Sequence, residues 1–233
     1  MLPAVHLLIG ITLGIFLLYL TKDCRALIYC AVGSLLPDII DKPVGHIVLT
    51  NLDNGRIFFH SLTICALIAL FGVIVIMKWR HPGLLFIAAG ILSHQFADAM
   101  WAAPRSWFWP FLGGFPQKYH PYYFQNMFSL EFSSPSEILV IAAALLFFFF
   151  LVIALHFGKN YLLRWAAGLV GLLLTAAGVL MLSGLLTDII PGSLIYTGFR
   201  DILICALSFL MGGVAFLLIS LLPPDWCGMK DFL

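Results

Sequence analysis

Seven long apolar stretches, separated by short polar segments, restrict this chain more than any other feature of its sequence. A transmembrane helix needs about 20 mainly apolar residues. Backbone polar groups in lipid must bond within their own segment, so such stretches form helices. We place them at about 2–20, 26–41, 60–77, 83–103, 137–157, 165–187 and 201–222. The sequence therefore predicts an all-α, polytopic membrane helix bundle with about seven transmembrane helices.

The composition supports this class. Only 10% of the residues are charged and the mean hydropathy is +1.06, whereas about a quarter of a soluble domain is charged. The net charge of +1 provides no field that would attract nucleic acid, so we expect no nucleic-acid partner. One irregularity is Pro37, which interrupts the second stretch after about 11 apolar residues. We expect the helix to break there, below the membrane surface.

Basic residues predict the orientation. With seven spans, the segments 21–25, 78–82, 158–164 and the tail from 223 share one face and hold seven of the 12 basic residues. The longer loops 42–59, 104–136 and 188–200 lie on the face of the N-terminus. Short loops rich in Lys and Arg stay in the cytoplasm. We therefore predict a multi-pass protein of the plasma (inner) membrane, with the N-terminus outside and the C-terminus in the cytoplasm.

Ionisable side chains within the first four stretches are the strongest indication of function. Each costs roughly 2.5–3.5 kcal/mol at the centre of a membrane helix, and the last three stretches carry none in their interiors. With the predicted orientation, all of those in the first four lie near the face of the N-terminus. They are His6, Asp38, Asp41, His60, His94 and Asp98.

These six side chains suit a metal ion. His94 and Asp98, at positions i and i+4, project from one helical face. Imidazole and carboxylate ligands suit zinc, manganese or iron, and the absence of cysteine ligands favours a hydrolytic site over a structural one. We predict that the six residues bind one or two divalent ions, with Zn²⁺ expected before Mn²⁺ or Fe²⁺. Asp41 is either a ligand or a carboxylate that orients a histidine.

Each residue alone has an ordinary explanation. His6 could be an interfacial side chain, the Pro37–Asp38 pair a turn, His60 a helix cap, and His94 with Asp98 an interhelical hydrogen bond. The convergence of all six on one face favours the metal site.

The same segments resemble a known family. "GSLLPDIID" (33–41), "GRIFFHSL" (55–62) and "LSHQFADA" (92–99), after the early histidine of "AVHLLIG", resemble the LexA-regulated, membrane-bound, metal-dependent hydrolases of the YdjM type. The resemblance covers residues 1 to about 112. The order of the ligands is also similar to that of the zinc-dependent phospholipase C and single-strand nuclease superfamily, whose members cleave phosphoesters with clustered zinc ions.

The chain departs from the family pattern at one segment. Gly55 and Phe59 stand where the pattern H-R-G-x-T-H-S has its first histidine and its threonine, while Arg56, His60 and Ser61 are kept. His46 is the candidate to replace the missing imidazole. Among downstream residues, His120 and Glu131 are the candidate further ligands.

The resemblance implies a metal-dependent hydrolase, and we expect a phosphoester substrate such as a lipid headgroup. Metal-activated water would be the nucleophile. Arg56 would bind a phosphate oxygen, although it could equally be a loop arginine at the headgroup level; Arg56 and Asp41 are the expected catalytic residues. The alternative is a metal-ion or proton-coupled transporter that uses the same cluster. A transport route needs polar groups across the whole membrane, which favours the enzyme.

The sequence predicts one membrane domain with three parts along the chain. Residues 1–112 form the four-helix core with the metal site, and 113–136 an aromatic interfacial loop. Residues 137–233 form a three-helix apolar scaffold that could also support a homo-oligomer. The aromatic loop is either an interfacial belt or a lid over the site. Membrane lipids and a lipid or small phosphoester substrate are the expected partners.

Overall fold

The computed structural model describes residues 3–120, 122–133, 142, 161–186 and 199–221, and within these ranges it is helical without a strand. The predicted all-α class is therefore confirmed, and the stretch expected at 137–157 lies almost wholly outside the described residues. The α-helices are α1 (Pro3–Thr21), α2 (Arg25–Pro43), α3 (Leu62–Trp79), α4 (Gly83–Ala97), α5 (Pro104–Trp107), α6 (Tyr123–Ser133), α8 (Tyr161–Leu186) and α9 (Phe199–Leu221). A π-helix, Val44–Val48, continues α2, and a 3₁₀-helix, Met100–Ala102, follows α4.

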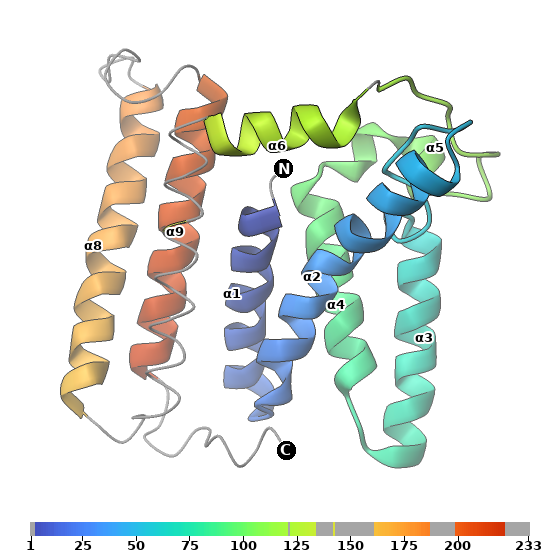
Figure 1. The fold of residues 1–233 in the computed structure, drawn as a ribbon. Coiled ribbons are helices and arrows are strands. Elements are labelled where there is room, and N and C mark those ends of the chain that lie inside the picture. Colours follow the sequence, from blue (N-terminus) through green and yellow to red (C-terminus); the bar gives the residue numbers. More distant parts are fainter. Residues whose placement is uncertain (1–2, 121, 134–141, 143–160, 187–198, 222–233) are drawn as a thin grey trace.

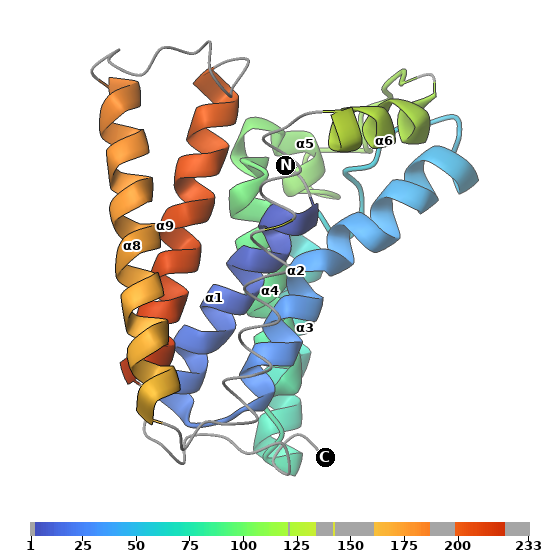
Figure 2. The ribbon, with the colours of Figure 1, turned by 60° about the vertical axis from the view of Figure 1, so that its left-hand side comes forward.

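Helices α1 to α4 run alternately up and down and form one group, while α8 and α9 pair beside it (Figures 1 and 2). Helix α2 packs against α1 and α4, α3 against α4, and α9 against α1. Helix α6 lies across one end of this assembly, at the end where α1 begins and α4 finishes (Figure 1). The loop expected at 104–136 thus contains two helices, α5 and α6.

Glycine lets α2 and α4 approach closely. A Cβ atom on Gly33 would lie 2.3 Å from the carbonyl oxygen of Ile87, and one on Gly90 would lie 2.4 Å from that of Cys30. Small residues at helix crossings allow backbones to meet in this way. Asp38 on α2 and His94 on α4 follow this crossing in the sequence. The close approach of the two helices therefore brings their side chains near each other.

Two predicted helix boundaries were wrong. Helix α2 does not break at Pro37 but continues to Pro43. Proline removes one backbone hydrogen bond, and packing against α1 and α4 offsets that loss. Helix α4 ends at Ala97 rather than near 103, because Ala99 adopts a left-handed conformation with φ 51°. That conformation costs about 1 kcal/mol, and the contacts that Asp98 makes at the helix end offset it.

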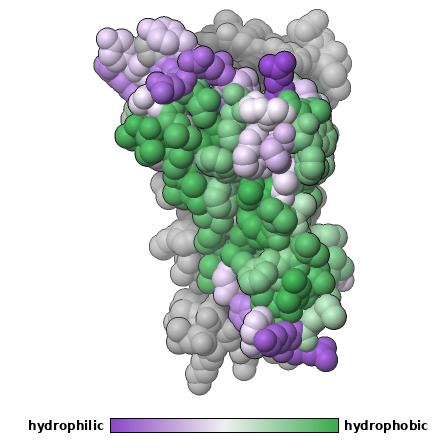
Figure 3. All heavy atoms as spheres, turned by 90° about the vertical axis from the view of Figure 1, so that its right-hand side faces the viewer, coloured by the Kyte–Doolittle hydropathy of each residue, from purple (hydrophilic) through white to green (hydrophobic). Residues whose placement is uncertain are grey.

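The surface matches a membrane environment. The segments Leu62–Trp79 and Trp165–Gly184 are long and apolar enough to cross a bilayer, and only 11% and 17% of their residues are buried. Shorter apolar helices accompany them at Val5–Thr21, Gly83–Ala97 and Phe209–Leu221. On the α3 side of the molecule, apolar residues form a broad band with hydrophilic residues at its two ends (Figure 3). The count of about seven spans goes beyond these helices and stays a prediction.

Candidate metal centre

The six predicted ligands converge at one end of the four-helix group. Helix α1 contributes His6 and α2 contributes Asp38 and Asp41, while His60 precedes α3 and His94 lies in the last turn of α4. The sixth residue, Asp98, caps α4. Four of the six side chains are fully buried, and those of Asp38 and Asp98 are each 6% exposed.

Five of the six form two overlapping ligand groups. His6, His94 and Asp98 make one, and Asp38, His60 and His94 make the other; within each, the ligand atoms lie within 4.8 Å of one another. The Nε2 atoms of His60 and His94 are 3.2 Å apart, and each lies 3.8 Å from Oδ1 of Asp38. On the other side, Nε2 of His6 lies 3.3 Å from Oδ1 of Asp98. His94 belongs to both groups.

The tautomers of His60 and His94 follow from their outer partners. Nδ1 of His94 lies 2.7 Å from the carbonyl oxygen of Ser34, which can only accept, so this nitrogen must donate. Nδ1 of His60 likewise donates to Oδ2 of Asp41 at 2.8 Å. With the ring proton on Nδ1, each neutral imidazole directs the lone pair of its Nε2 at the other. Two lone pairs at 3.2 Å repel each other unless a cation lies between them.

Buried polar atoms without good hydrogen bonds also indicate a site for a cation. Within the described residues, the ring nitrogens of His6 and the carboxylate oxygens of Asp38 are buried and make no hydrogen bond of good geometry, although Nε2 of His6 faces Asp98 at 3.3 Å. Buried polar groups in proteins nearly always have partners, and an unpaired charge is especially costly to bury. Nζ of Lys42, 2.7 Å from Oδ2 of Asp38, offsets part of that charge. The donor set of three histidines and two carboxylates therefore fits a divalent metal such as Zn²⁺.

The sequence left open whether Asp41 is a metal ligand or a carboxylate that orients a histidine, and the geometry fits the second role. Its carboxylate accepts hydrogen bonds from the backbone N–H groups of Ile57, Phe59 and His60, at 3.3, 3.1 and 3.0 Å, besides the bond from the ring of His60. It lies in neither ligand group. Asp41 thus holds the segment before α3 and orients His60, as carboxylates behind metal-binding histidines do.

We expect Asp41→Asn to weaken metal binding by about 10- to 100-fold, because the amide is a weaker acceptor for the His60 ring and for the backbone donors. Competition with a chromophoric chelator measures this change. Asp23→Asn is the matched control, since Asp23 pairs with Arg25 at the opposite end of α2. Unchanged affinity in Asp41→Asn would contradict the orienting role.

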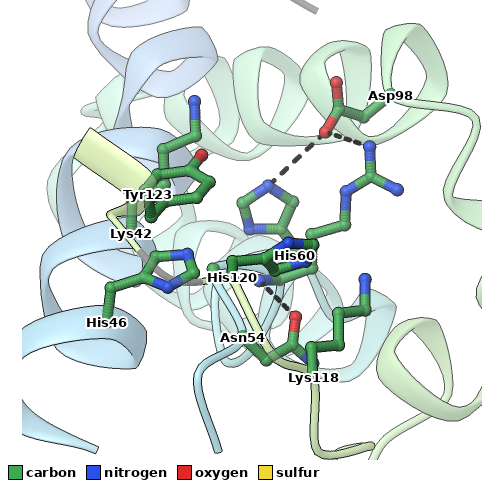
Figure 4. A pocket seen from close by; sticks show the side chains of 10 residues that line it. Lys42, His46, Asn54, His60, Asp98, Lys118, His120 and Tyr123 are labelled. Atoms are coloured by element: carbon green, nitrogen blue, oxygen red, sulfur yellow. Dashed lines mark hydrogen bonds and ion pairs between the residues drawn. The ribbon is translucent and has the colours of Figure 1, made fainter. Parts of the chain in front are cut away.

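A pocket of about 240 Å³ opens onto this cluster (Figure 4). His60 and Asp98 form part of its wall, and Nη2 of Arg56 lies 3.1 Å from Oδ2 of Asp98. Arg56 thus lies beside the ligands, as the sequence predicted. The other lining residues are Lys42, His46, Asn54, Gly55, Lys118, His120 and Tyr123.

Several pocket residues come from the aromatic segment for which the sequence left open an interfacial belt or a lid over the site. The backbone N–H of Lys118 donates to the carbonyl of Leu52 at 2.8 Å, and Nδ2 of Asn54 donates to the carbonyl of Pro116 at 2.9 Å. These bonds join residues 52–54 to 116–118 and bring Lys118, His120 and Tyr123 over the cluster. His120 lines the pocket but belongs to neither ligand group.

The pocket is electropositive. Among the described lining residues, Lys42, Arg56 and Lys118 contribute three cations, and Asp98 is the one acidic residue. Burial, together with the charge of Arg56, lowers the pKa of Lys118. A bound anion would reduce the repulsion between Arg56 and Lys118, because its charge stabilises both cations. The pocket therefore suits an anionic ligand next to the metal ligands.

Comparison with known proteins places the chain in a family. Residues 1–162, which include all six predicted ligands and the whole pocket lining, match the family described as YdjM inner membrane protein. Neither the curated proteins nor the solved structures include a match. The chain belongs to the YdjM inner membrane protein family.

Proposed function

We propose that this protein is a membrane-embedded, metal-dependent phosphoester hydrolase whose substrate is a lipid headgroup. One observation carries the proposal: a pocket with three cationic side chains opens directly onto a buried cluster of His and Asp ligands. A phosphate ester supplies the anion, and the cluster supplies the chemistry. When bound, a divalent metal lowers the pKa of its water towards about 7, which makes a nucleophile available at neutral pH.

The side chains around the cluster have distinct roles in this proposal. Arg56 binds a phosphate oxygen with its guanidinium, while its ion pair with Asp98 fixes the position of both. Lys42 and Lys118 neutralise the remaining charge of the substrate. His6, His60 and His94 are fully buried, so we expect the attacking water to lie where the cluster faces the pocket.

The surroundings of the pocket favour a substrate in the membrane. Tyr119 and Tyr122, which flank the lining residue His120, are 83% and 77% exposed, and Phe111 is 81% exposed. Aromatic side chains collect at the level of the lipid headgroups. A phosphate at that level can enter the pocket while its acyl or prenyl chains stay in the bilayer.

The proposal places the site on the outer side of the membrane. We expect a cysteine introduced at Tyr119 to react with a membrane-impermeant thiol reagent on intact cells, and one at Lys78 to be protected, because basic residues such as Lys78 and Arg80 favour the cytoplasmic side. Both variants are made in a background without the native cysteines. Labelling only at position 78 would reverse the orientation.

Activity is tested on the purified, metal-loaded protein in lipid with a panel of phosphate mono- and diesters, including phospholipids and prenyl phosphates. We expect hydrolysis that a chelator abolishes and added metal restores. Arg56→Ala should chiefly raise KM, since the guanidinium binds ground state and transition state alike. Arg105→Ala is the control, because Arg105 is an exposed arginine on α5 outside the pocket lining. Absence of cleavage across the panel would contradict the proposed function.

A further inference from the structure

His46 forms a second constellation in the pocket, apart from the metal ligands. Its Nδ1 lies 2.6 Å from Oδ1 of Asp53, and the other carboxylate oxygen of Asp53 accepts a hydrogen bond from the backbone N–H of His120. These hydrogen bonds hold the pKa of Asp53 below its ordinary value. Asp53 is therefore a carboxylate, and Nδ1 of His46 donates to it. The tautomer and the position of the ring are both fixed.

The other nitrogen of this ring is buried and unpaired. The side chain of His46 is only 3% exposed, and its Nε2 has no hydrogen-bond partner among the residues that the structure describes. The ring stacks on Tyr123, with centroids 3.8 Å apart and planes inclined by 12°. A buried nitrogen without a partner, fixed in the wall of a pocket, is placed for a bond with a bound molecule.

Gly55 provides the space for this nitrogen. A Cβ atom at position 55 would lie 2.9 Å from Nε2 of His46, closer than real Cβ contacts allow. Any larger residue there would displace the imidazole from its present place. The position of the His46 ring in the pocket therefore depends on the absence of a side chain at residue 55.

We propose that His46 is the general acid of the reaction and protonates the leaving oxygen of the phosphoester, with Asp53 as its positioning residue. The inference rests on the proposed hydrolase function. His46 and Asp98 face the pocket from opposite sides (Figure 4). In phosphoryl transfer the attacking and leaving oxygens lie roughly in line on opposite sides of phosphorus. With the nucleophile on the side of the His and Asp cluster, the leaving oxygen faces His46.

The step balances without any further reactant. The oxygen of the attacking water bonds to phosphorus as the bond from phosphorus to the leaving oxygen breaks, and the electron pair of that bond stays on the leaving oxygen. The proton on Nε2 of the His46 imidazolium passes to this oxygen and yields a neutral alcohol. The proton lost by the attacking water goes to solvent, from which His46 is protonated again. The carboxylate of Asp53 and the bound phosphate stabilise the imidazolium.

Other pocket residues suit this role less well. Burial raises the pKa of Tyr123, which makes its hydroxyl a weaker acid. Lys118 pairs with no carboxylate in the described part of the chain, and the exposed His120 contributes its backbone N–H to Asp53. Among the described pocket residues outside the ligand cluster, His46 is the one whose ring is fixed by a carboxylate while its second nitrogen is unpaired.

Leaving-group dependence tests the proposal on the full-length, metal-loaded protein. The leaving group of a 4-nitrophenyl phosphate ester departs as a stable phenolate and needs little protonation. The alkoxide that leaves from the corresponding alkyl ester needs a proton from an acid. We expect His46→Asn to slow cleavage of the alkyl ester by about 100-fold or more, and cleavage of the nitrophenyl ester by less than about tenfold. Asp53→Asn and Gly55→Ala should show the same selectivity in weaker form, and they keep the imidazole if His46→Asn fails to fold. His81→Asn, outside the pocket, should change neither rate.

The outcomes separate the two proposals. Equal losses on the two esters, in variants that retain wild-type metal content, would overturn the general-acid role and leave the hydrolase intact. A wild-type protein that cleaves neither ester nor any member of the wider panel would overturn the hydrolase, and with it the role of His46. A loss of activity confined to the alkyl ester supports both the hydrolase function and the general-acid role of His46.

Discussion

Replacing His94 with alanine should remove most of the metal from the purified protein and abolish hydrolysis. Among the described residues, His94 is the one that the two ligand groups share, so its loss affects both at once. We expect the metal content to fall to less than about a tenth of the wild-type value, since even the loss of an outer partner weakens a metal site by 10- to 100-fold. Elemental analysis of protein prepared without chelators measures the content.

His81→Ala is the matched control for this variant. His81 accepts a hydrogen bond from the backbone N–H of Gly83, at the end of α4 opposite to His94. It should keep wild-type metal content and activity. Full metal occupancy in the His94 variant would show that the ion binds elsewhere and would contradict the assigned ligands.

Asp98→Asn should abolish hydrolysis while leaving the fold intact. The exchange keeps the size of the side chain but removes the charge that faces Nε2 of His6 at 3.3 Å and Nη2 of Arg56 at 3.1 Å. Metal ions contribute several kcal/mol to transition-state stabilisation, so we expect kcat/KM to fall by at least about a thousandfold. Steady-state kinetics in lipid, with the thermal unfolding midpoint as the check on folding, measure both effects.

The same variant distinguishes the enzyme from a transporter. In proteoliposomes, a transporter would carry metal or proton flux that Asp98→Asn blocks, and the wild type would cleave no phosphoester. The enzyme would show cleavage without flux. The ligand cluster favours the enzyme, because its described members gather at one end of the four-helix group and α3 carries no His, Asp, Glu, Lys or Arg between Thr63 and Met77.

The sequence predicted that the six His and Asp side chains meet at one end of the helices, because the physical basis of this convergence is local. Titratable side chains in apolar helices are costly, and helix direction alone decides at which end of a bundle they lie. The end of α4 was missed, since no glycine or proline marks it and a left-handed Ala99 has no sequence signature. Pro37 was misread because tertiary packing overrode its tendency to break a helix.

The wall of the pocket could not be predicted in the same way. Lys118, His120 and Tyr123 reach the site through irregular backbone that is fixed by single hydrogen bonds to residues 52–54. Such contacts leave no periodic pattern. His46 was considered only as a replacement for the imidazole missing at Gly55, and its pairing with Asp53 depends on a turn in which Asp53 has a positive φ of 43°.

X-ray absorption spectroscopy on the purified protein in lipid tests the central claim, that the His and Asp cluster holds a transition metal, most directly. We predict an absorption edge of zinc, manganese or iron with nitrogen and oxygen neighbours only, at about 2.0–2.2 Å for zinc. The multiple-scattering signal of imidazole should be present in the wild type and reduced in His94→Ala. The absence of any such edge from protein never exposed to chelators, or sulfur neighbours at about 2.3 Å, would contradict it.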